Sequence, residues 1–152
     1  MSTNIHIRRA TKADIPTIIT LQENDGFPHP HYVTTERLLR LFHRGEVYFL
    51  AVVNGITVGF ASIDYEIRAQ IHYLSVHRDY WRKGIGSMLM KTVIDESKSR
   101  GYDRVSVYVQ AESPIEIFLE KKGFFKVGYY KNRYRNGKDV TIWEVDLLQR
   151  RN

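Results

Sequence analysis

The 152-residue chain contains no cysteine, only four prolines and no long apolar run. Without cysteine the protein can form no disulfide and use no thiolate as a nucleophile or metal ligand, which fits a reducing compartment. No apolar run approaches the roughly 18 residues that a membrane-spanning helix needs. The opening residues, MSTNIHIRRATKADIP, also lack the apolar core of a signal peptide. We therefore expect a cytoplasmic protein without membrane contact.

The composition is that of an ordinary globular protein. Hydrophobic residues make up 43% of the chain and charged residues 26%, so we expect one domain over residues 1–152. The net charge of +6 favours anionic partners. The basic residues are scattered, however, and only the final RRN forms a cluster, so nucleic acid is not the expected partner.

The spacing of apolar residues predicts one strand, two helices, three strands, a helix, a strand, a helix and two strands. Asn54-Gly55 and Asn136-Gly137 lie between apolar runs and predict tight hairpins. Capping boxes that begin at Thr11 and Ser113 predict helix starts. Strands mixed with helices in this order indicate a mixed sheet with helices on its faces. Strands are expected at 4–10, in hairpins at 46–65 and 124–147, and at 70–77 and 102–109.

The stretch YWRKGIGSMLM, residues 80–90, places two basic residues and a Gly-Ile-Gly turn directly before an expected helix. The free N–H groups at a helix start bind phosphate or pyrophosphate, and Gly84 and Gly86 leave the backbone open to such a ligand. Arg82 and Lys83 supply positive charge. The spacing fits neither a Walker loop nor the dinucleotide fingerprint. Taken alone, the loop is either a phosphate cradle or a plain strand-to-helix turn.

The segment LSVHRDYWRKGIGSMLMKTVIDESKSRGYDRVSVYVQAESPIEIFLEKKGFFKVGYY resembles the core of the GNAT superfamily of acetyl-CoA-dependent N-acetyltransferases. The family loop, Q/R-x-x-G-x-G/A, finds its glycines at Gly84 and Gly86, while Trp81 replaces the Gln or Arg. The resemblance implies a layered α+β fold (α/β/α) with a mixed, mostly antiparallel sheet of about seven strands and four helices. It also implies a V-shaped splay between the fourth and fifth strands.

The resemblance further implies an N-acetyltransferase with acetyl-CoA as cosubstrate and no metal. The amine acceptor would be a small molecule or a peptide, and a homodimer stays open. By position, Leu74, Ser75 and Val76 would contact the pantetheine arm as if it were an added strand. Glu112 stands where the family has an Asn that contributes to the cofactor site. The pyrophosphate would be held by Arg82, Lys83, Gly84, Ile85, Gly86 and Ser87.

One departure concerns catalysis. Leu119 stands where many relatives carry a Tyr that protonates the departing thiolate, and Leu119 cannot do so. Another donor or solvent then supplies the proton, or the chain is a silent acyl-CoA-binding or regulatory module. Tyr108 and Tyr134 are the candidate acids, and core packing is the alternative role for each.

Acetyl transfer also needs a base that frees the amine from its proton. His72 is the candidate, because histidine titrates near neutrality and the strand IHYLSVHR is similar to that of arylalkylamine N-acetyltransferases, which carry a His here. Histone-type relatives place a Glu where this chain has Gln70. Strict alternation would put His72, Leu74 and Val76 on one face of the strand. The alternative is a structural histidine bonded to the backbone.

The segment FPHPHY, residues 27–32, lies where the family keeps its acceptor-binding loop. His29, His31 and Tyr32 are therefore expected to line the acceptor site, and Glu23 or Asp25 could attract a cation. His29 and His31 also have the spacing of metal ligands. A zinc site is not expected, since the chain has no cysteine and no third ligand is evident.

Overall fold

A seven-stranded sheet forms the centre of the protein, which is described here by a computed structural model for residues 4–24, 34–131 and 137–148. The strand order is β1-β2-β3-β4-β5-β7-β6, and all neighbours are antiparallel except β4 and β5. The mixed, mostly antiparallel sheet and the helices predicted from the sequence are confirmed. The strands are β1 (Ile5–Arg9), β2 (Val47–Val53), β3 (Ile56–Asp64), β4 (Gln70–Val76), β5 (Arg104–Gln110), β6 (Phe125–Tyr130) and β7 (Val140–Asp146). The helices are α1 (Ile15–Glu23), α2 (Thr35–His43), α3 (Ile85–Ser99) and α4 (Pro114–Lys121), with short 3₁₀ turns η1 (Lys12–Asp14) and η2 (Arg78–Tyr80).

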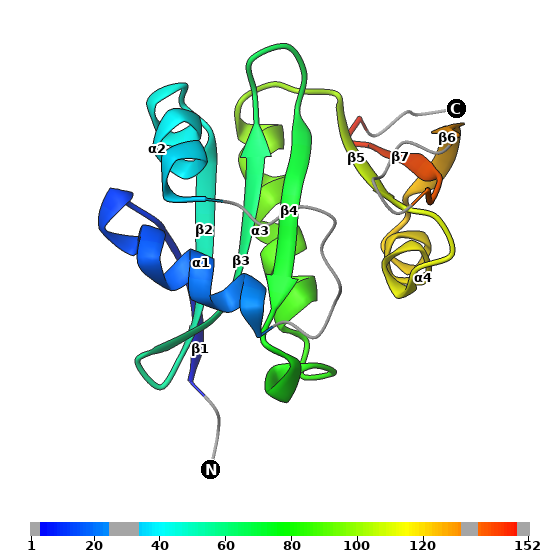
Figure 1. The fold of residues 1–152 in the computed structure, drawn as a ribbon. Helices are drawn as coiled ribbons and strands as arrows, with labels where there is room; N and C mark the ends of the chain where they lie inside the picture. Colours follow the sequence, from blue (N-terminus) through cyan, green and yellow to red (C-terminus); the bar gives the residue numbers. More distant parts are fainter. Residues whose placement is uncertain (1–3, 25–33, 132–136, 149–152) are drawn as a thin grey trace.

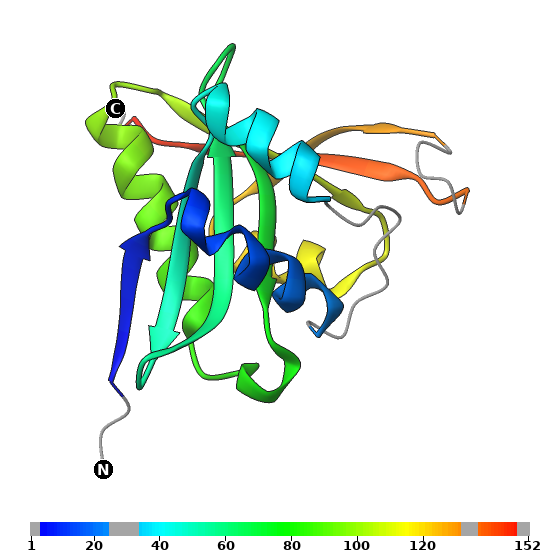
Figure 2. The ribbon, with the colours of Figure 1, turned by 60° about the vertical axis from the view of Figure 1, so that its left-hand side comes forward.

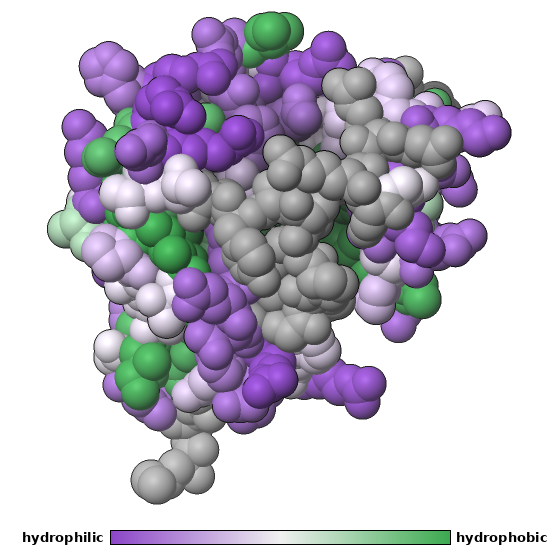
Figure 3. Space-filling view, in the orientation of Figure 1, coloured by the Kyte–Doolittle hydropathy of each residue, from purple (hydrophilic) through white to green (hydrophobic). Residues whose placement is uncertain are grey.

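Helices cover both faces of the sheet: α1 and α2 lie on one face, and α3 and α4 on the other (Figures 1 and 2). In α3, Ile85, Leu89 and Val93 recur at the spacing of one helix face and are fully buried against the sheet. α2 buries Leu38 and Leu41, and its hydrophilic side chains gather on the outside (Figure 3). Among the described residues, no helix is both long and apolar enough to span a membrane.

A salt bridge ties the start of α1 to β1. Arg8 donates two hydrogen bonds to the Asp14 carboxylate, at 2.7 and 3.0 Å, and the Thr11 N–H donates a third at 2.8 Å. The bond from Thr11 is half of the predicted capping box. The hydrogen bond from Arg8 is the main cause that lowers the pKa of Asp14 below its ordinary value.

Replacing Asp14 with Asn should therefore destabilise the protein by about 1 kcal/mol at pH 7, a modest value because Arg8 is 43% exposed and water screens the pair. A carboxylate with a lowered folded-state pKa stabilises above the pKa of the unfolded chain, and this is lost as the pH falls through the folded value. Urea unfolding at pH 7 and near pH 3 tests this. A difference between the two proteins that stays constant with pH would contradict it.

Gly59 in β3 lies directly against β4 and α3. A Cβ built there would sit 2.9 Å from the Ser75 carbonyl oxygen and 3.4 Å from Leu89 Cδ1, so there is no room for any side chain. We expect Gly59→Ala to lower the free energy of unfolding by about 1–3 kcal/mol, the cost of overpacking a well-packed core. Gly128→Ala in β6 is the matched control, because its Cβ would meet only Ile142 at an ordinary 3.7 Å. Urea unfolding measures both, and equal stability of the two variants would refute the expectation.

The fourth and fifth strands diverge, as predicted. β4 and β5 pair in parallel at only two positions, Gln70 with Ser106 and Ile71 with Val107. Beyond these pairs each strand continues without the other, and Figure 1 shows them moving apart. We call this divergence the splay. It leaves one edge of β4 without a strand partner beyond Ile71.

The expected alternation along β4 is wrong, because a bulge interrupts it. Ser62 pairs with Tyr73 and Ile63 pairs with Ile71, so His72 is an extra residue in the ladder. Ile71 and Leu74 consequently pack on the α3 face, while Tyr73 packs on the α1 face. The bulge lies at the first residue past the last β4–β5 pair.

Candidate active site

The edge of β4 that faces the splay presents backbone hydrogen-bonding groups. The His77 N–H donates to the Val58 carbonyl at 2.8 Å, which fixes the register of the β3–β4 pair at this end. In an antiparallel pair, alternate residues point their N–H and C=O groups away from the partner strand. Leu74 and Val76 are the residues so placed, and their backbone groups point toward the splay. An extended ligand can pair with them as an added strand would.

The predicted phosphate loop lies at the start of α3, directly after η2. Gly84 caps the helix with φ at +82°, in the left-handed region that favours glycine. The first hydrogen bond of the helix runs from the Met88 N–H to the Gly84 carbonyl at 3.0 Å. The N–H groups of residues 85–87 therefore precede the helical ladder and can bind an anion.

The basic residues of the loop have distinct places. Arg82 adopts φ +63°, also in the left-handed region, and its conformation turns the chain into the glycine pair. The Lys83 ammonium lies 5.3 Å from the centre of the Tyr80 ring in a cation–π contact. Both residues are exposed and come just before the helix start in the chain.

Trp81, which departs from the family loop, links that loop to β4. Its indole Nε1–H donates to the Val76 carbonyl at 2.8 Å. The bond holds the loop against the end of the strand and occupies one of the carbonyl groups that point toward the splay. The substitution thus gives the loop an anchor, while the N–H groups that would bind an anion are unaffected.

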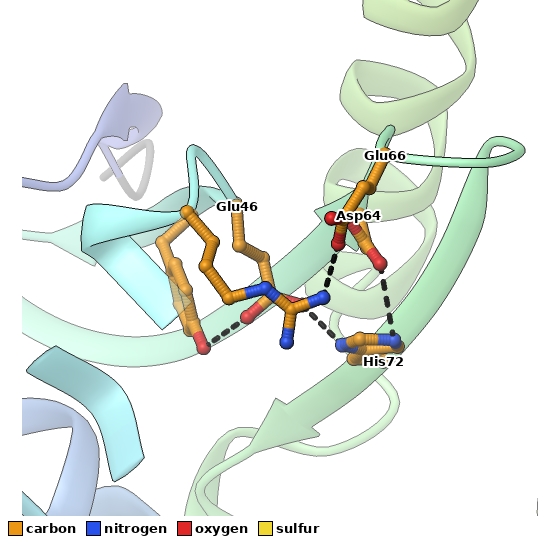
Figure 4. A network of polar contacts seen from close by, with 6 residues as sticks. Glu46, Asp64, Glu66 and His72 are labelled. Atoms are coloured by element: carbon orange, nitrogen blue, oxygen red, sulfur yellow. Dashed lines mark hydrogen bonds and ion pairs between the residues drawn. The ribbon is translucent and has the colours of Figure 1, made fainter. Parts of the chain in front are cut away.

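His72 lies between two carboxylates (Figure 4). Its Nδ1 contacts Glu46 Oε1, and its Nε2 lies 4.0 Å from Asp64 Oδ2. The Glu46 side chain is only 1% exposed, whereas those of His72 and Asp64 are each 26% exposed. The Nδ1 edge of the ring thus meets a buried carboxylate, and the Nε2 edge lies on the side of the partly exposed one.

Glu46 was missed by the sequence analysis. It precedes β2, and its Oε2 accepts a hydrogen bond from the Tyr48 hydroxyl at 2.6 Å. Burial and the neighbouring Glu46 charge raise the pKa of Tyr48, so the phenol keeps its proton and donates it. Nearby, Glu66 forms an exposed ion pair with Arg44. In the described part of the chain, no group of three or more His, Asp or Glu side chains could hold a metal ion.

Tyr108 follows the last β4–β5 pair on β5, as His72 does on β4. Val107 and Val109 pack in the core on the α3 face, so Tyr108 points to the opposite face. Its ring lies 6.0 Å from that of Tyr130, centre to centre. Burial and then the neighbouring Tyr130 raise the pKa of Tyr108, which therefore stays protonated at neutral pH.

The α4 region shows which side chains surround Leu119, the residue that replaces the Tyr of the family pattern. Leu119 is completely buried in the core beside α3, so nothing polar replaces the family Tyr at this place. Glu112 is exposed with φ at +61°, and its N–H donates to Glu116 Oε1 at 2.7 Å. α4 begins after Ser113 as predicted, but the Glu116 carboxylate accepts from Glu112 rather than from the cap residue.

Several predicted residues lie outside the described parts of the chain. They are His29, His31, Tyr32, Tyr134, Asp25 and Asn136. Among those described, the structure gathers Leu74, Val76 and the glycine loop along one strand and its following helix. His72 and Tyr108 lie at the opposite end, where the splay begins.

A sheet split between two parallel strands, with a glycine loop at the head of the helix that joins them, defines the architecture of N-acetyltransferases. A sequence model of the acetyltransferase (GNAT) family matches residues 15–124, most of the chain. The chain belongs to that family.

Individual relatives agree with this assignment. An uncharacterised N-acetyltransferase of Methanocaldococcus jannaschii is 30% identical over 135 residues, which cover 78% of this chain and 59% of that protein. The chain thus spans less than two thirds of that relative. The ribosomal-protein-S18-alanine N-acetyltransferase of Escherichia coli has a TM-score of 0.84 at 22% identity, covering 98% of this chain and 97% of that one. An acetyltransferase of Salmonella typhimurium, solved with its cofactor acetyl-CoA, has a TM-score of 0.78 at 19% identity, with 97% and 96% covered. At these identities the two structures show the shared fold.

Proposed function

We propose that the protein transfers an acetyl group from acetyl-CoA to a primary amine of a small molecule or peptide, by direct attack within a ternary complex. The observation that carries the proposal is the splay, whose β4 edge ends at a helix start with free N–H groups. An extended amide chain that ends in a pyrophosphate matches both features at once. Family membership and the acetyl-CoA held by the Salmonella typhimurium protein support this assignment.

When bound, acetyl-CoA supplies an activated acyl thioester. The backbone groups of Leu74 and Val76 that point toward the splay are the proposed partners of its pantetheine arm, whereas those of Ser75, between them, point toward β3 and are not available to it. The N–H groups of residues 85–87 would hold its pyrophosphate, and the charges of Arg82 and Lys83 would add attraction. Glu112 lies near the start of α4, where its carboxylate is exposed and its backbone is held by Glu116.

The proposed chemistry begins with proton removal. The acceptor ammonium gives one proton to His72, which passes it to water. The freed amine nitrogen forms a bond to the thioester carbon while the carbon–sulfur bond breaks and leaves its electron pair on sulfur. The sulfur takes one proton and leaves as the thiol, and the second amine proton restores the group that donated it. The Leu74 N–H, which points toward the splay two residues beyond His72, is the proposed donor to the thioester oxygen, whose charge grows during attack. The Val76 N–H lies about 13 Å along the strand from His72, too far for both to act on one thioester.

A proton donor for sulfur must come from a residue other than Leu119. Tyr108 is our candidate, because it faces the side of the sheet that carries His72. Its pKa is raised, so the phenol is protonated at neutral pH and can act as a donor. Tyr134 stays a second candidate. His29, His31 and Tyr32 stay proposed acceptor contacts. The Escherichia coli neighbour is a ribosomal-protein-S18-alanine N-acetyltransferase, so we propose peptide amines as the first class of acceptor to test.

A second candidate function is a silent acyl-CoA-binding module. The burial of Leu119 favours it, because the usual proton donor is replaced by an apolar core residue.

Thiol release separates the two functions. The protein is incubated with acetyl-CoA and a panel of small amines and peptides, and the free thiol is followed with a chromogenic reagent. Turnover that depends on an acceptor supports the transferase. CoA binding in a calorimeter without turnover on any acceptor would favour the silent module. An absence of CoA binding would refute both.

A further inference from the structure

We propose that Glu46 is the positioning residue of this site: its buried carboxylate holds His72 with the proton on Nδ1, so that Nε2 is the free base. The proposal deepens the function proposed above and rests on it. Glu46 is the residue directly before β2, so it belongs neither to the glycine loop nor to β4.

The first argument concerns protons. An ionised carboxylate can only accept hydrogen bonds, so the imidazole nitrogen that touches it must carry a hydrogen. Glu46 Oε2 accepts from the Tyr48 hydroxyl, and Oε1 is in contact with Nδ1 of His72. In the neutral ring the other nitrogen, Nε2, is then the one with a free lone pair.

The second argument concerns access. Glu46 is almost completely buried and His72 is partly exposed, so an acceptor can reach only the outer edge of the ring. That edge carries Nε2, with Asp64 Oδ2 4.0 Å away, too far for a hydrogen bond that would require a hydrogen on Nε2. When Nε2 takes a proton from an ammonium group, the positive ring lies between two carboxylates that stabilise it.

The third argument concerns the bulge. His72 is the extra residue in β4, and it is the first residue after the sheet splits. Bulges re-aim side chains next to active sites. Here the bulge coincides with the contact to Glu46, so two independent features fix one imidazole ring.

Nitrogen NMR tests the tautomer directly, without any acceptor. The protein has six histidines, and the resonance of His72 is identified by its loss in His72→Gln. Long-range proton–nitrogen correlations on the neutral ring report which nitrogen carries the hydrogen. We expect the hydrogen on Nδ1 in the native protein. In Glu46→Gln, Tyr48 holds the amide oxygen and the amide N–H₂ faces Nδ1, so the hydrogen moves to Nε2.

Glu66→Gln is the matched control, because it removes a nearby carboxylate whose ion-pair partner is Arg44, whereas the carboxylates beside His72 are Glu46 and Asp64. Its tautomer should equal that of the native protein. A native His72 with its hydrogen on Nε2, or a Glu46→Gln ring with an unchanged tautomer, would overturn the proposal. The native measurement decides alone if Glu46→Gln does not fold.

Kinetics give the second readout. We expect Glu46→Gln to lower kcat/KM for the acceptor about 10- to 100-fold, part of the 10²- to 10⁴-fold that a general base contributes. The KM for acetyl-CoA should not change, and Glu66→Gln should match the native enzyme. Native kinetics in Glu46→Gln would refute the role of Glu46. If no protein turns over, including the native one, the proposed function fails while the NMR result on Glu46 stands by itself.

Discussion

Replacing His72 with alanine is expected to lower the rate of acetyl transfer about 10²- to 10⁴-fold at pH 7, the contribution of a general base. The loss should be much smaller at pH 9, because a larger share of the amine is then already free of its proton. The carboxylates that face His72 are Glu46 on the buried side and Asp64 on the exposed side, and the Arg44 guanidinium interacts electrostatically with both of them.

Steady-state rates of His72→Ala across this pH range, with acetyl-CoA and a responsive acceptor, make the measurement. His6→Ala is the control, since His6 is an exposed histidine on β1 at the far edge of the sheet. It should behave as the native protein at both pH values. An equal loss in His72→Ala at pH 7 and pH 9 would assign His72 a structural role instead.

Replacing Gly86 with Asp should weaken CoA binding at least about 100-fold. The N–H groups at the start of α3 are the proposed pyrophosphate ligands, and losing one or two charge-assisted hydrogen bonds costs about 3 kcal/mol. The new carboxylate repels the pyrophosphate from the same place. The fold should survive, because an acidic residue in the first helical turn is favourable and a Cβ there meets only the Phe118 ring at 3.7 Å.

Titration calorimetry with CoA measures the affinity, and the melting temperature verifies the fold. Gly86→Ala separates the two effects, because it adds the Cβ without the charge and should lose much less affinity. CoA affinity of Gly86→Asp within a few fold of native would show that the pyrophosphate lies elsewhere.

The sequence predicted those parts of the site that depend on short stretches of chain. The glycine loop and the helix stripe of Ile85, Leu89 and Val93 are local patterns, and the structure confirms them. The split between the fourth and fifth strands was implied by the resemblance to a known family, and the structure confirms it too. A single extra residue in β4 leaves no trace in hydrophobic periodicity, so the bulge at His72 was not foreseen.

Glu46 could not be found from the sequence for a different reason. A charged residue between a helix and a strand is typical of an exposed turn, and the preceding His-Arg-Gly strengthens that impression. Only the pairing of β2 with β3, and of β3 with β4, brings this carboxylate to His72. One signal was present: the apolar run that follows Glu46 begins at once, which places the residue at a buried strand end.

The splay also links ligand binding to folding. Only two residue pairs join β4 to β5, so the sheet consists of two halves held by few backbone bonds and by the shared core on the α3 face. A ligand that pairs along the open edge of β4 replaces bonds that the chain does not make with itself. By mass action, such a ligand raises the free energy of unfolding as its concentration rises above its dissociation constant. The resistance of this protein to heat and proteolysis would then rise with the concentration of that ligand.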